Sequence, residues 1–400
     1  MGADALVIGA GPSGLLAAKE IASHGFDVKI LEEHTKVGIP NHCAGLLSVE
    51  GLKKLGVNPS QRFVQNEVMG GRIYAPDGSH IEIRDKHTRA FVVNRTEFDS
   101  ALAEQATSVG AEVVFGHKVK KLRFSGGTAV GAEGDDWEEK SRIVIDAEGA
   151  SRRLLKEANL VSCTESYLIG VNTEVSCELD SSMVEVWFGN DLAPGFFAWV
   201  IPISDKEARV GLATRNKDAT KTLDAFLMRR FGSTSHSTLS TGQVLVGGPY
   251  SRTEFDGMLL VGDSAGHVKP TTGGGVILGG LCALEAGKVA SNAFNSGDVS
   301  EPNLREYDRI WREKYGDEFR SMLTLRHFAN RLSDERMNRI FHAFSGAGLE
   351  KTLNELVAEG DMDLQKDVIK RVFTEPRLTK ALLSSLSRFA FDELRDLVNL

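Results

Sequence analysis

The stretch DALVIGAGPSG, residues 4–14, stands near the start of the chain and decides how the first part of it folds. The apolar run that ends at Gly9 predicts a short buried strand. The glycine-rich turn after it opens a helix over residues 15–23, and a second strand follows over residues 27–31. Together these elements predict one strand–helix–strand unit of about 30 residues.

Each glycine of the turn has a separate physical role. Gly9 makes the turn tight, Gly11 lets the backbone approach a pyrophosphate, and Gly14 lets the helix pack closely on the strand. The N-terminus of the helix then presents its partial positive charge to the phosphates. Glu32, at the end of the second strand, is placed to accept hydrogen bonds from ribose hydroxyls. The unit therefore predicts a dinucleotide site, and a glycine turn without a ligand is the alternative.

Two later segments indicate which dinucleotide to expect. LLVGDSAG, residues 259–266, predicts a buried strand that ends in Gly-Asp, so that Asp263 can accept hydrogen bonds from the hydroxyls of a ribityl chain. PTTGGGV, residues 270–276, is a glycine loop that opens a helix, and bare amides in such a loop stabilise negative charge on a flavin ring. The cofactor-binding residues expected in this loop are Gly274, Gly275 and Val276. These segments favour FAD over NAD.

The composition excludes several classes of protein. With 47 basic and 55 acidic residues, the chain carries a net charge of −8, so a nucleic acid is a poor candidate for its main partner. Its four cysteines form no CxxC pair, which argues against a zinc or iron–sulfur site, and no metal is expected. No apolar run reaches the roughly 18 residues that span a bilayer. We therefore expect a cytoplasmic protein, with peripheral contact at a membrane surface left open.

The order of the elements predicts a discontinuous architecture. Alternation of apolar and polar residues predicts a mainly antiparallel sheet over residues 66–89 and 161–251. The nucleotide domain into which it is inserted is expected to comprise residues 1–65, 90–160 and 252–300. Residues 301–400 have a helical pattern with charges of both signs. The predicted fold class is α/β, as an α+β composite: a Rossmann-like FAD-binding domain with an inserted antiparallel β-sheet substrate domain and C-terminal helices.

A third segment resembles an element of a known group of flavoproteins. VIDAEGASR, residues 144–152, resembles the A-D-G-x-x-S-x-x-R element of FAD-dependent hydroxylase-type proteins, with Glu148 in place of the usual Asp. Arg95, within VNRTEFD over residues 93–99, matches the arginine that opens a helix near the flavin in that group. An arginine at a helix start is otherwise unfavourable for the helix dipole, which favours a ligand role for Arg95.

The most specific resemblance is to one family within this group. VGIPNHCAG, residues 37–45, fits the pattern P-x-x-C-x-G of the archaeal geranylgeranyl reductases. These are flavoproteins of the para-hydroxybenzoate-hydroxylase fold that saturate the isoprenoid chains of membrane lipids. The resemblance covers nearly the whole chain. It implies that FAD is the cofactor, that this segment lies beside the flavin ring, and that Cys43, Ala44 and Val119 are among the cofactor-binding residues.

A second pattern of the family, Y-x-W-x-F-P-K, is met in part by FAWVIPI, residues 197–203. Ile201 and Ile203 replace the second aromatic residue and the lysine, and these positions line the pocket in the family, so the departures bear on which substrate is bound. The same stretch resembles the W-x-W-x-I-P pattern of flavin-dependent halogenases. Because side chains alternate along a strand, Phe197, Trp199 and Ile201 share one face, and we expect them to form a wall of an apolar substrate pocket.

The chemistry that this resemblance implies needs a source of protons. An isolated alkene is a poor hydride acceptor, so it must be polarised or protonated by an acid in a dry apolar channel. Cys43 is the catalytic candidate, because a thiol either donates a proton or packs against the ring. A small buried apolar residue is the alternative reading of Cys43, and His42 is a second candidate proton source.

Other functions are open at this point. An aromatic monooxygenase or a halogenase would use the same fold, although residues 40–45 argue against both. An electron carrier to a membrane quinone is a second alternative, but the related quinone oxidoreductases use a cysteine-ligated cluster that the scattered cysteines cannot supply. A flavin-binding protein without turnover is a third. For the reductase, the resemblance implies an isoprenoid lipid substrate and an external electron donor, namely ferredoxin, a deazaflavin or NAD(P)H.

Overall fold

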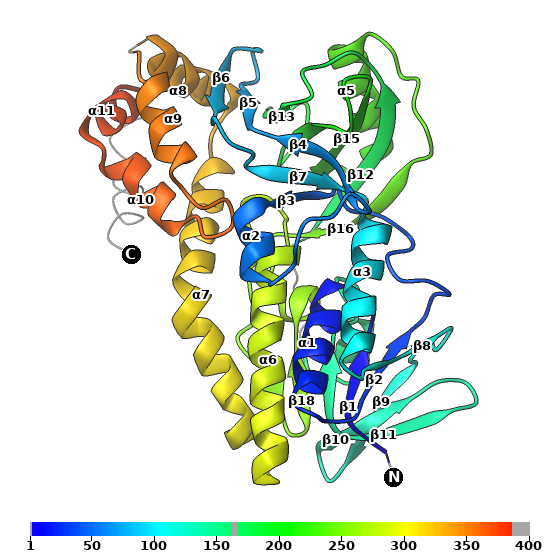
Figure 1. Cartoon of the computed structure of the whole chain (residues 1–400). Coiled ribbons are helices and arrows are strands. Elements are labelled where there is room, and N and C mark those ends of the chain that lie inside the picture. The colour runs from blue at the N-terminus through cyan, green and yellow to red at the C-terminus, as the bar shows by residue number, and fades with distance from the viewer. Residues whose placement is uncertain (1, 162–166, 347, 386–400) are drawn as a thin grey trace. The chain divides into compact units, whose positions relative to one another are not determined.

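The computed structural model describes residues 2–161, 167–346 and 348–385 (Figure 1). The chain forms two compact units, each built from three separate segments. Unit 1 comprises Met1–Asn41, Arg95–Ser166 and Leu245–Phe319, and unit 2 comprises His42–Asn94, Tyr167–Val244 and Arg320–Leu400. The three-part division predicted from the sequence stays a prediction, and its residues 162–166 and 386–400 lie outside the described residues.

Unit 1 is built on a parallel sheet whose centre is the strand predicted at the start of the chain. β1 (Ala3–Ile8) lies between β2 (Val28–Glu32) and β11 (Glu138–Asp146) and pairs in parallel with both. β8 (Glu112–Phe115) and β18 (Met258–Leu260) extend the sheet in parallel on either side. A parallel central strand is covered on both faces, which is why the first strand is an almost continuous apolar run.

Helices cover one face of this sheet. α1 (Pro12–Ser23) lies between α3 (Arg95–Ser108) and α6 (Val276–Ser296), as Figure 1 shows. α1 and α6 approach closely because Gly287 of α6 has no side chain: a Cβ added there would lie 2.7 Å from the Cβ of Glu20.

The opposite face of the sheet is covered by a hairpin and a short helix. β9 (Lys121–Ser125) and β10 (Thr128–Glu133) form the hairpin, and Gly126 and Gly127 turn it with φ angles of 59° and 93°. Positive φ at both turn positions is the geometry that glycine adopts without strain, so the two glycines fix the turn. α4 (Arg153–Glu157) contributes leucines to the core beneath the hairpin.

An aromatic cluster lies between the last strands of unit 1 and its long helix. β17 (Glu254–Phe255) pairs antiparallel with β18, the short helical turn η1 (Gly262–Ala265) follows, and α7 (Glu301–Ala329) runs past them. His267, with no exposed surface, lies among the rings of α7, its centroid 4.6 Å from that of Trp311. Neither ring nitrogen of His267 has a hydrogen-bond partner within the described residues.

His267 is expected to make the protein sensitive to mild acid. Burial, with the charges of Arg312 and Arg152 adding to it, lowers the pKa of His267 from 6.5 to about 3. The stability that comes from keeping this ring neutral is present above pH 6.5. It is lost as the pH falls towards 3, since the unfolded chain takes up a proton that the folded chain does not.

Between pH 6.5 and 5.0 the free energy of unfolding should therefore fall by about 1.5 kcal/mol through His267. Urea unfolding of wild type and His267→Phe at the two pH values measures this, because phenylalanine keeps a ring among the aromatic neighbours and cannot titrate. Equal pH dependence of the two proteins would show that His267 is not the group responsible.

Unit 2 is built on a seven-stranded sheet in the order β16-β12-β15-β14-β13-β5-β6. Its strands are β5 (Gly70–Tyr74), β6 (His80–Arg84), β12 (Tyr167–Ser176), β13 (Met183–Trp187), β14 (Ala198–Pro202), β15 (Glu207–Thr214) and β16 (Ser240–Leu245). Of the pairs whose register is described, all are antiparallel except β13 with β5, which is parallel. The predicted antiparallel sheet is thus confirmed, with one parallel pair.

The two faces of this sheet pack against different elements. On one face, Ala198 and Val200 of β14 lie in a core with α5 (Ala219–Phe231). On the other face, Trp199 and Ile201 pack in a cluster with a small three-stranded sheet. That small sheet consists of β3 (Leu46–Ser48), β7 (Ala90–Val93) and β4 (Val64–Val68), and α2 (Val49–Lys54) follows its first strand.

The C-terminal part of unit 2 is helical, as predicted. Its helices are α8 (Asp334–Gly346), α9 (Glu350–Ala358), α10 (Lys366–Thr374) and α11 (Pro376–Ser385). The side chain of Asn354 ties α9 to the edge of the large sheet, accepting from the backbone N of Arg84 at 2.7 Å and donating to its O at 3.1 Å. Among the described residues, none of the helices combines the length and the apolar composition that a membrane-spanning segment needs.

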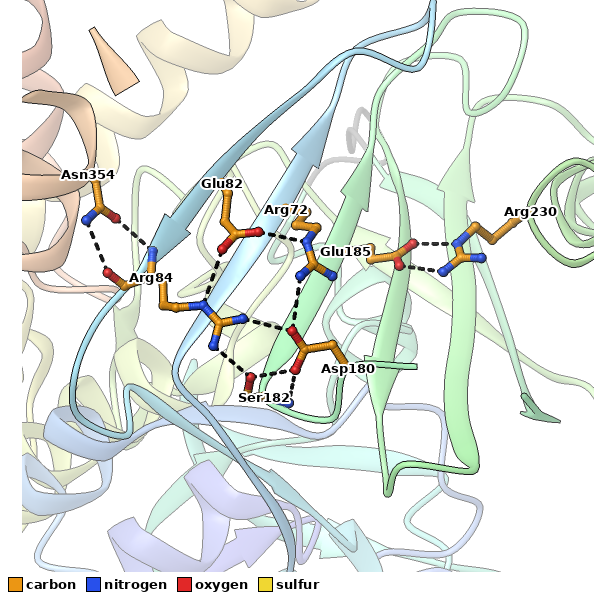
Figure 2. Close-up of polar contacts among 8 residues, drawn as sticks. All are labelled: Arg72, Glu82, Arg84, Asp180, Ser182, Glu185, Arg230 and Asn354. Carbon is orange, nitrogen blue, oxygen red and sulfur yellow. Dashed lines mark hydrogen bonds and ion pairs between the residues drawn. The ribbon is translucent and has the colours of Figure 1, made fainter. Parts of the chain in front are cut away.

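Charged side chains hold the outer strands of the large sheet together (Figure 2). Arg72 donates to Glu82 at 2.9 Å and to Asp180 at 3.0 Å, and Arg84 donates to Asp180 at 2.8 Å. Hydrogen bonds from Ser182 and from the two arginines lower the pKa of Asp180 to about 2. These groups are well exposed, so each pair is expected to contribute less than about 1 kcal/mol to stability.

A buried pair in the same region should matter far more. Glu185 is 4% exposed and accepts two hydrogen bonds from Arg230, at 2.8 and 2.7 Å, as Figure 2 shows. Arg230→Met would leave this carboxylate buried without its cation, so the free energy of unfolding should fall by about 3 kcal/mol, as measured by urea unfolding.

The control for Arg230→Met is the double variant Glu185→Gln with Arg230→Met, in which the amide oxygen still accepts from the Nε1 of Trp187. It removes both charges and is expected to recover most of the lost stability, because no uncompensated charge stays buried. A single variant as stable as the wild type, or a double variant less stable than the single one, would contradict this account of the pair.

Candidate functional site

The glycine turn between β1 and α1 has the shape that the sequence predicts. A Cβ added at Gly9 would lie 2.5 Å from the O of Ala147, and one at Gly14 would lie 2.2 Å from the O of Gly9, so neither position tolerates a side chain. At Gly11, by contrast, an added Cβ would meet no atom of the described residues within 4 Å. The backbone at Gly11 therefore faces open space, into which a ligand can approach closely.

The first turn of α1 is suited to an anion. Gly11 is its N-cap residue, Pro12 stands in its first turn, and among the described residues no side chain caps it. The first N–H groups of a helix lack partners inside the helix, and here no acidic side chain of the first turn neutralises the dipole. Open space at Gly11 and an uncapped helix N-terminus together suit an anionic group such as a phosphate.

Glu32 is held rigidly at the end of β2. Its Oε2 accepts a hydrogen bond from the backbone N of Ala10 at 2.9 Å, which ties it to the glycine turn. Its Oε1 accepts from the backbone N of His34 at 2.9 Å, and the Nδ1 of His34 lies 2.7 Å from the same oxygen. Oε2 accepts only one of these bonds and has a second lone pair, so Glu32 keeps acceptor capacity for a ribose hydroxyl through that oxygen.

The second predicted segment places Asp263 in η1, directly after β18. A Cβ added at Gly275 would lie 2.6 Å from the Oδ1 of Asp263, so this glycine lets the loop pass close to the carboxylate. Gly275 is also the N-cap residue of α6, which begins at Val276 without a side-chain cap among the described residues. A Cβ at Gly274 would lie 2.9 Å from the Cε of Lys269. The carboxylate of Asp263 and the uncapped N-terminus of α6 therefore lie side by side.

Charges in unit 1 act on this carboxylate. Removal from water raises the pKa of Asp263, and the positive charges of Arg152 and Arg95 oppose that rise. Arg95 opens α3 as predicted and donates to both carboxylate oxygens of Asp99, each at 3.0 Å. Asp99 is 3% exposed, and burial raises its pKa. Arg95 is therefore oriented by Asp99 and electrostatically coupled to Asp263.

The family resemblance also implies that Val119 is a cofactor-binding residue. The structure buries its side chain in the core of unit 1, and its O accepts a hydrogen bond from Arg153 at 2.6 Å. This side chain is a core residue, and its role towards a cofactor stays a prediction.

A buried carboxylate lies beneath the glycine turn. Asp146, at the end of β11, is fully buried; its Oδ1 accepts from the N of Glu148 at 3.1 Å, and its Oδ2 has no partner within the described residues. Burial and the negative charge of Glu148 raise the pKa of Asp146 to about 7. Glu148, the residue that departs from the family element, accepts from the backbone N of Leu154 at 3.0 Å at the start of α4. The Glu148 side chain therefore accepts a hydrogen bond from a backbone N–H in the first turn of α4.

Unit 2 places the segment that contains Cys43 on the face of its sheet that bears Trp199 and Ile201. We call residues 42–45 the strap. Asn172 of β12 donates to the O of His42 at 3.1 Å, and Arg209 of β15 donates to the O of Ala44 at 2.9 Å. The strap therefore lies across the sheet strands, held by side chains from two of them.

Cys43 is half-buried in the middle of the strap, and its Sγ accepts from the N of Gly45 at 3.4 Å. His42 lies at one end, with its Nδ1 2.9 Å from the Oγ of Ser240 on β16. Gly45 has a φ of 73°, and a Cβ there would lie 2.5 Å from the O of Val93. Only glycine allows the strap to close down on β7 at that point.

The structure brings together two of the three residues predicted to form a wall of the substrate pocket. Trp199 and Ile201 share a face of β14, opposite to Ala198 and Val200, as their spacing predicts. Phe197 precedes the strand, and its ring lies 6.2 Å from that of Trp199. Ile201 and Ile203, which replace an aromatic residue and a lysine of the family pattern, are buried in one apolar cluster that Ala44 also contacts. Trp199 and Ile201 thus form an apolar strip on a face that also bears Arg209 opposite Ile201, and the role of this strip towards a substrate stays a prediction.

Sequence reasoning missed two residues that hold the strap, Asn172 and Arg209. Both are buried, with 5% of each exposed; Arg209 stands between Ala208 and Val210 on β15, and Asn172 follows a run of mainly apolar residues on β12. An amide and a guanidinium at strand positions expected to be buried are the signal that could have found them, because buried polar groups need specific partners. Which partner they bind depends on the strand register and is not visible in the sequence.

Comparison with known proteins agrees with these geometric observations. Residues 2–279 match a family described as an FAD binding domain. The chain is 31% identical over 396 residues to the digeranylgeranylglycerophospholipid reductase of Methanocaldococcus jannaschii, covering 94% of this chain and 96% of that protein.

Solved structures share the fold. A geranylgeranyl bacteriochlorophyll reductase-like protein from Thermoplasma acidophilum superposes with a TM-score of 0.82 at 23% identity, over 99% of each chain. A flavin-dependent brominase, Bmp2, superposes with a TM-score of 0.69 at 16% identity, over 91% of this chain and 97% of its own. At these identities both structures establish the fold alone. They confirm the predicted α/β composite.

Proposed function

Because this chain belongs to the FAD-binding-domain family, and within it to the digeranylgeranylglycerophospholipid reductases, we propose that it saturates the double bonds of geranylgeranyl chains of lipids with FAD as cofactor. The chain is thus an FAD-dependent oxidoreductase that acts on carbon–carbon double bonds. The structural observation that carries this conclusion is the strap, which holds a half-buried thiol on the sheet face that bears Trp199 and Ile201.

The residues of unit 1 fit FAD. The open backbone at Gly11 and the uncapped start of α1 suit its pyrophosphate, and Glu32 suits its adenosine ribose. Asp263 suits the hydroxyls of the ribityl chain, and the glycine loop that ends at Gly275 suits the flavin ring. We propose that Gly9, Gly14, Arg95, Val119, Gly274 and Val276 complete this site, with Cys43 and Ala44 contributed from the strap.

FAD, once reduced, supplies the hydride that an alkene carbon accepts. The chain's own task is then to deliver a proton to the other carbon and to keep water away. We propose that the Sγ–H of Cys43 gives this proton and that the resulting thiolate regains one from solvent. Each double bond thereby gains one hydride and one proton.

The apolar wall has two effects on this reaction. Trp199 and Ile201, with Phe197 beside them, exclude water from an isoprenoid chain that lies against them. They also present no charged group, which suits a substrate that is a hydrocarbon along most of its length. We propose that these residues bind the isoprenoid chain and that the exchange of a lysine for Ile203 leaves the wall more apolar.

The reaction fixes the kinds of partner that the chain needs. Its substrate is an isoprenoid lipid, and an external donor has to return two electrons for every double bond that is saturated. We propose ferredoxin, a deazaflavin or NAD(P)H as this donor. We also propose that the protein is cytoplasmic and meets its lipid by peripheral contact at the membrane surface.

An anaerobic reoxidation assay tests the function. Protein loaded with FAD is reduced with dithionite to the end point and mixed with a digeranylgeranyl phospholipid. The absorbance of oxidised flavin is expected to return with this lipid, and not with its fully saturated counterpart, which is the matched control.

Two other results would contradict the reductase. Flavin that stays reduced with the lipid but is reoxidised by a quinone would identify an electron carrier. Flavin that is reoxidised only when oxygen and an aromatic compound are supplied would identify a monooxygenase, or a halogenase if halide is also incorporated.

A further inference from the structure

We propose that Asn172 and Arg209 are positioning residues that hold the backbone of Cys43 in register over the sheet. This inference rests on the role given to Cys43 in the proposed function. The evidence is two hydrogen bonds within unit 2. The carbonyl oxygens of His42 and Ala44, the residues before and after Cys43, each accept a hydrogen bond from a side chain of the sheet.

Asn172 acts on the residue before Cys43. Its Nδ2 donates to the O of His42 at 3.1 Å, across a long separation in the chain. In the sheet, Asn172 on β12 stands opposite Gly211 on β15, and Gly211 stands opposite Trp199 on β14. Residues opposite each other in antiparallel strands point to the same face, so Asn172 and Trp199 face the strap together.

The other end of the Asn172 amide is unsatisfied. Its Oδ1 is buried and has no hydrogen-bond partner within the described residues, and the same holds for the Nε1 of Trp199. An unpaired buried carbonyl destabilises the folded state. The folded protein should therefore be at least as stable with an apolar residue of similar size at position 172 as with asparagine. The bond from Nδ2 to the strap is therefore the contribution that distinguishes Asn172 from leucine.

Arg209 acts on the residue after Cys43. It is 5% exposed, and its Nη1 donates to the O of Ala44 at 2.9 Å and to the O of Val93 at 3.4 Å. Its Nη2 donates to Glu174 at 3.0 Å, which balances the charge. A Cβ on Gly45 would lie 2.6 Å from Nη1, so a side chain at this position would displace the guanidinium from the strap.

The consequence for Cys43 follows from the two bonds together. Asn172 holds the peptide group that precedes Cys43, and Arg209 holds the peptide group between Ala44 and Gly45. The N–H of that second peptide group binds the Sγ of Cys43 at 3.4 Å, so the two bonds together restrict the backbone around Cys43 and the direction of its thiol. A proton donor displaced by about 1 Å loses much of its rate, which makes such positioning a functional requirement. With either bond removed, the thiol should become more mobile and more open to reagents.

The test compares Asn172→Leu with wild type in two measurements. The rate at which iodoacetamide alkylates Cys43, followed by peptide mass spectrometry on the FAD-loaded protein, is expected to rise at least five-fold. The kcat for lipid saturation is expected to fall at least ten-fold while KM changes less than two-fold. The melting temperature should stay equal to that of wild type or rise, which a merely structural role does not predict.

Two further variants make the result specific. Arg209→Lys keeps a cation that binds one carbonyl group, and it should give alkylation and kcat values between those of wild type and Asn172→Leu. Thr173→Val is the matched control. Thr173 neighbours Asn172, is equally buried, and bonds through its Oγ1 to the O of Ser237 on the opposite face of the sheet. Its loss should leave Cys43 alkylation unchanged.

Three outcomes would overturn the proposal. They are unchanged alkylation and kcat in Asn172→Leu, equal acceleration of alkylation in Thr173→Val, and loss of folding in Asn172→Leu together with wild-type behaviour of Arg209→Lys. Failure of the proposed function is distinguishable, because the alkylation rates report on the strap even in a protein that does not saturate the lipid.

Discussion

Gly11→Ala is expected to weaken FAD binding about a hundred-fold while the chain stays folded. A Cβ at this position meets no atom of the described residues within 4 Å, and the φ of −74° suits alanine, so the fold has no reason to change. The added methyl group would occupy the space into which the pyrophosphate approaches the backbone. A hundred-fold loss is about 2.7 kcal/mol of binding free energy, measurable by titrating the apoprotein with FAD and following flavin fluorescence.

Two matched glycine variants control this experiment. Gly316→Ala, in the middle of α7, adds a methyl group whose nearest contact is the Cβ of Arg312 at 3.7 Å, and it should leave both FAD binding and folding intact. Gly14→Ala would place a Cβ 2.2 Å from the O of Gly9, and it should lower the melting temperature together with FAD binding. Equal FAD affinity of Gly11→Ala and wild type would show that the phosphates bind elsewhere.

Cys43→Ala is expected to lower the rate of lipid saturation about a hundred-fold without loss of FAD. Transfer of a proton by a positioned side chain contributes at least this factor, and alanine has no proton to give. The thiol is half-buried and the strap is held through backbone carbonyls, so the fold and the flavin content should be unchanged. Single-turnover reoxidation of the reduced, FAD-loaded protein by the unsaturated lipid measures the rate.

Cys43→Ser separates proton donation from packing. Serine keeps nearly the size of cysteine but is a much weaker acid, so its rate should also be low if the thiol donates the proton. A serine variant as fast as wild type would mean that Cys43 only packs in the site. Cys177→Ser, which changes another half-buried thiol of unit 2, is the matched control and should keep the wild-type rate.

Local sequence patterns predicted those parts of the fold whose geometry is determined locally. The start of the chain forms β1, α1 and β2 as expected, because the apolar run and the glycine turn impose their conformations within a few residues. Gly126 and Gly127 fix the hairpin turn for the same reason. The strand spacing also placed Trp199 and Ile201 on one face of β14.

Contacts that depend on strand register could not be predicted. Asn172 reaches the strap only because β12, β15 and β14 pair in the observed order, and the sequence fixes neither that order nor its register. The parallel pairing of β5 with β13 joins distant segments in the same way. The aromatic cage around His267 is formed by α7, which follows it in the chain only after α6.

The mass of the lipid after anaerobic turnover decides whether this chain saturates isoprenoid double bonds. Reduced, FAD-loaded protein is incubated with a digeranylgeranyl phospholipid without oxygen, and the lipid is analysed by mass spectrometry. We expect a gain of two hydrogens for each double bond saturated, in proportion to the flavin oxidised, and a much smaller gain with Cys43→Ala. A lipid of unchanged mass beside oxidised flavin, or one that gains oxygen or halogen when these are supplied, would show that the chain is not a reductase of these double bonds.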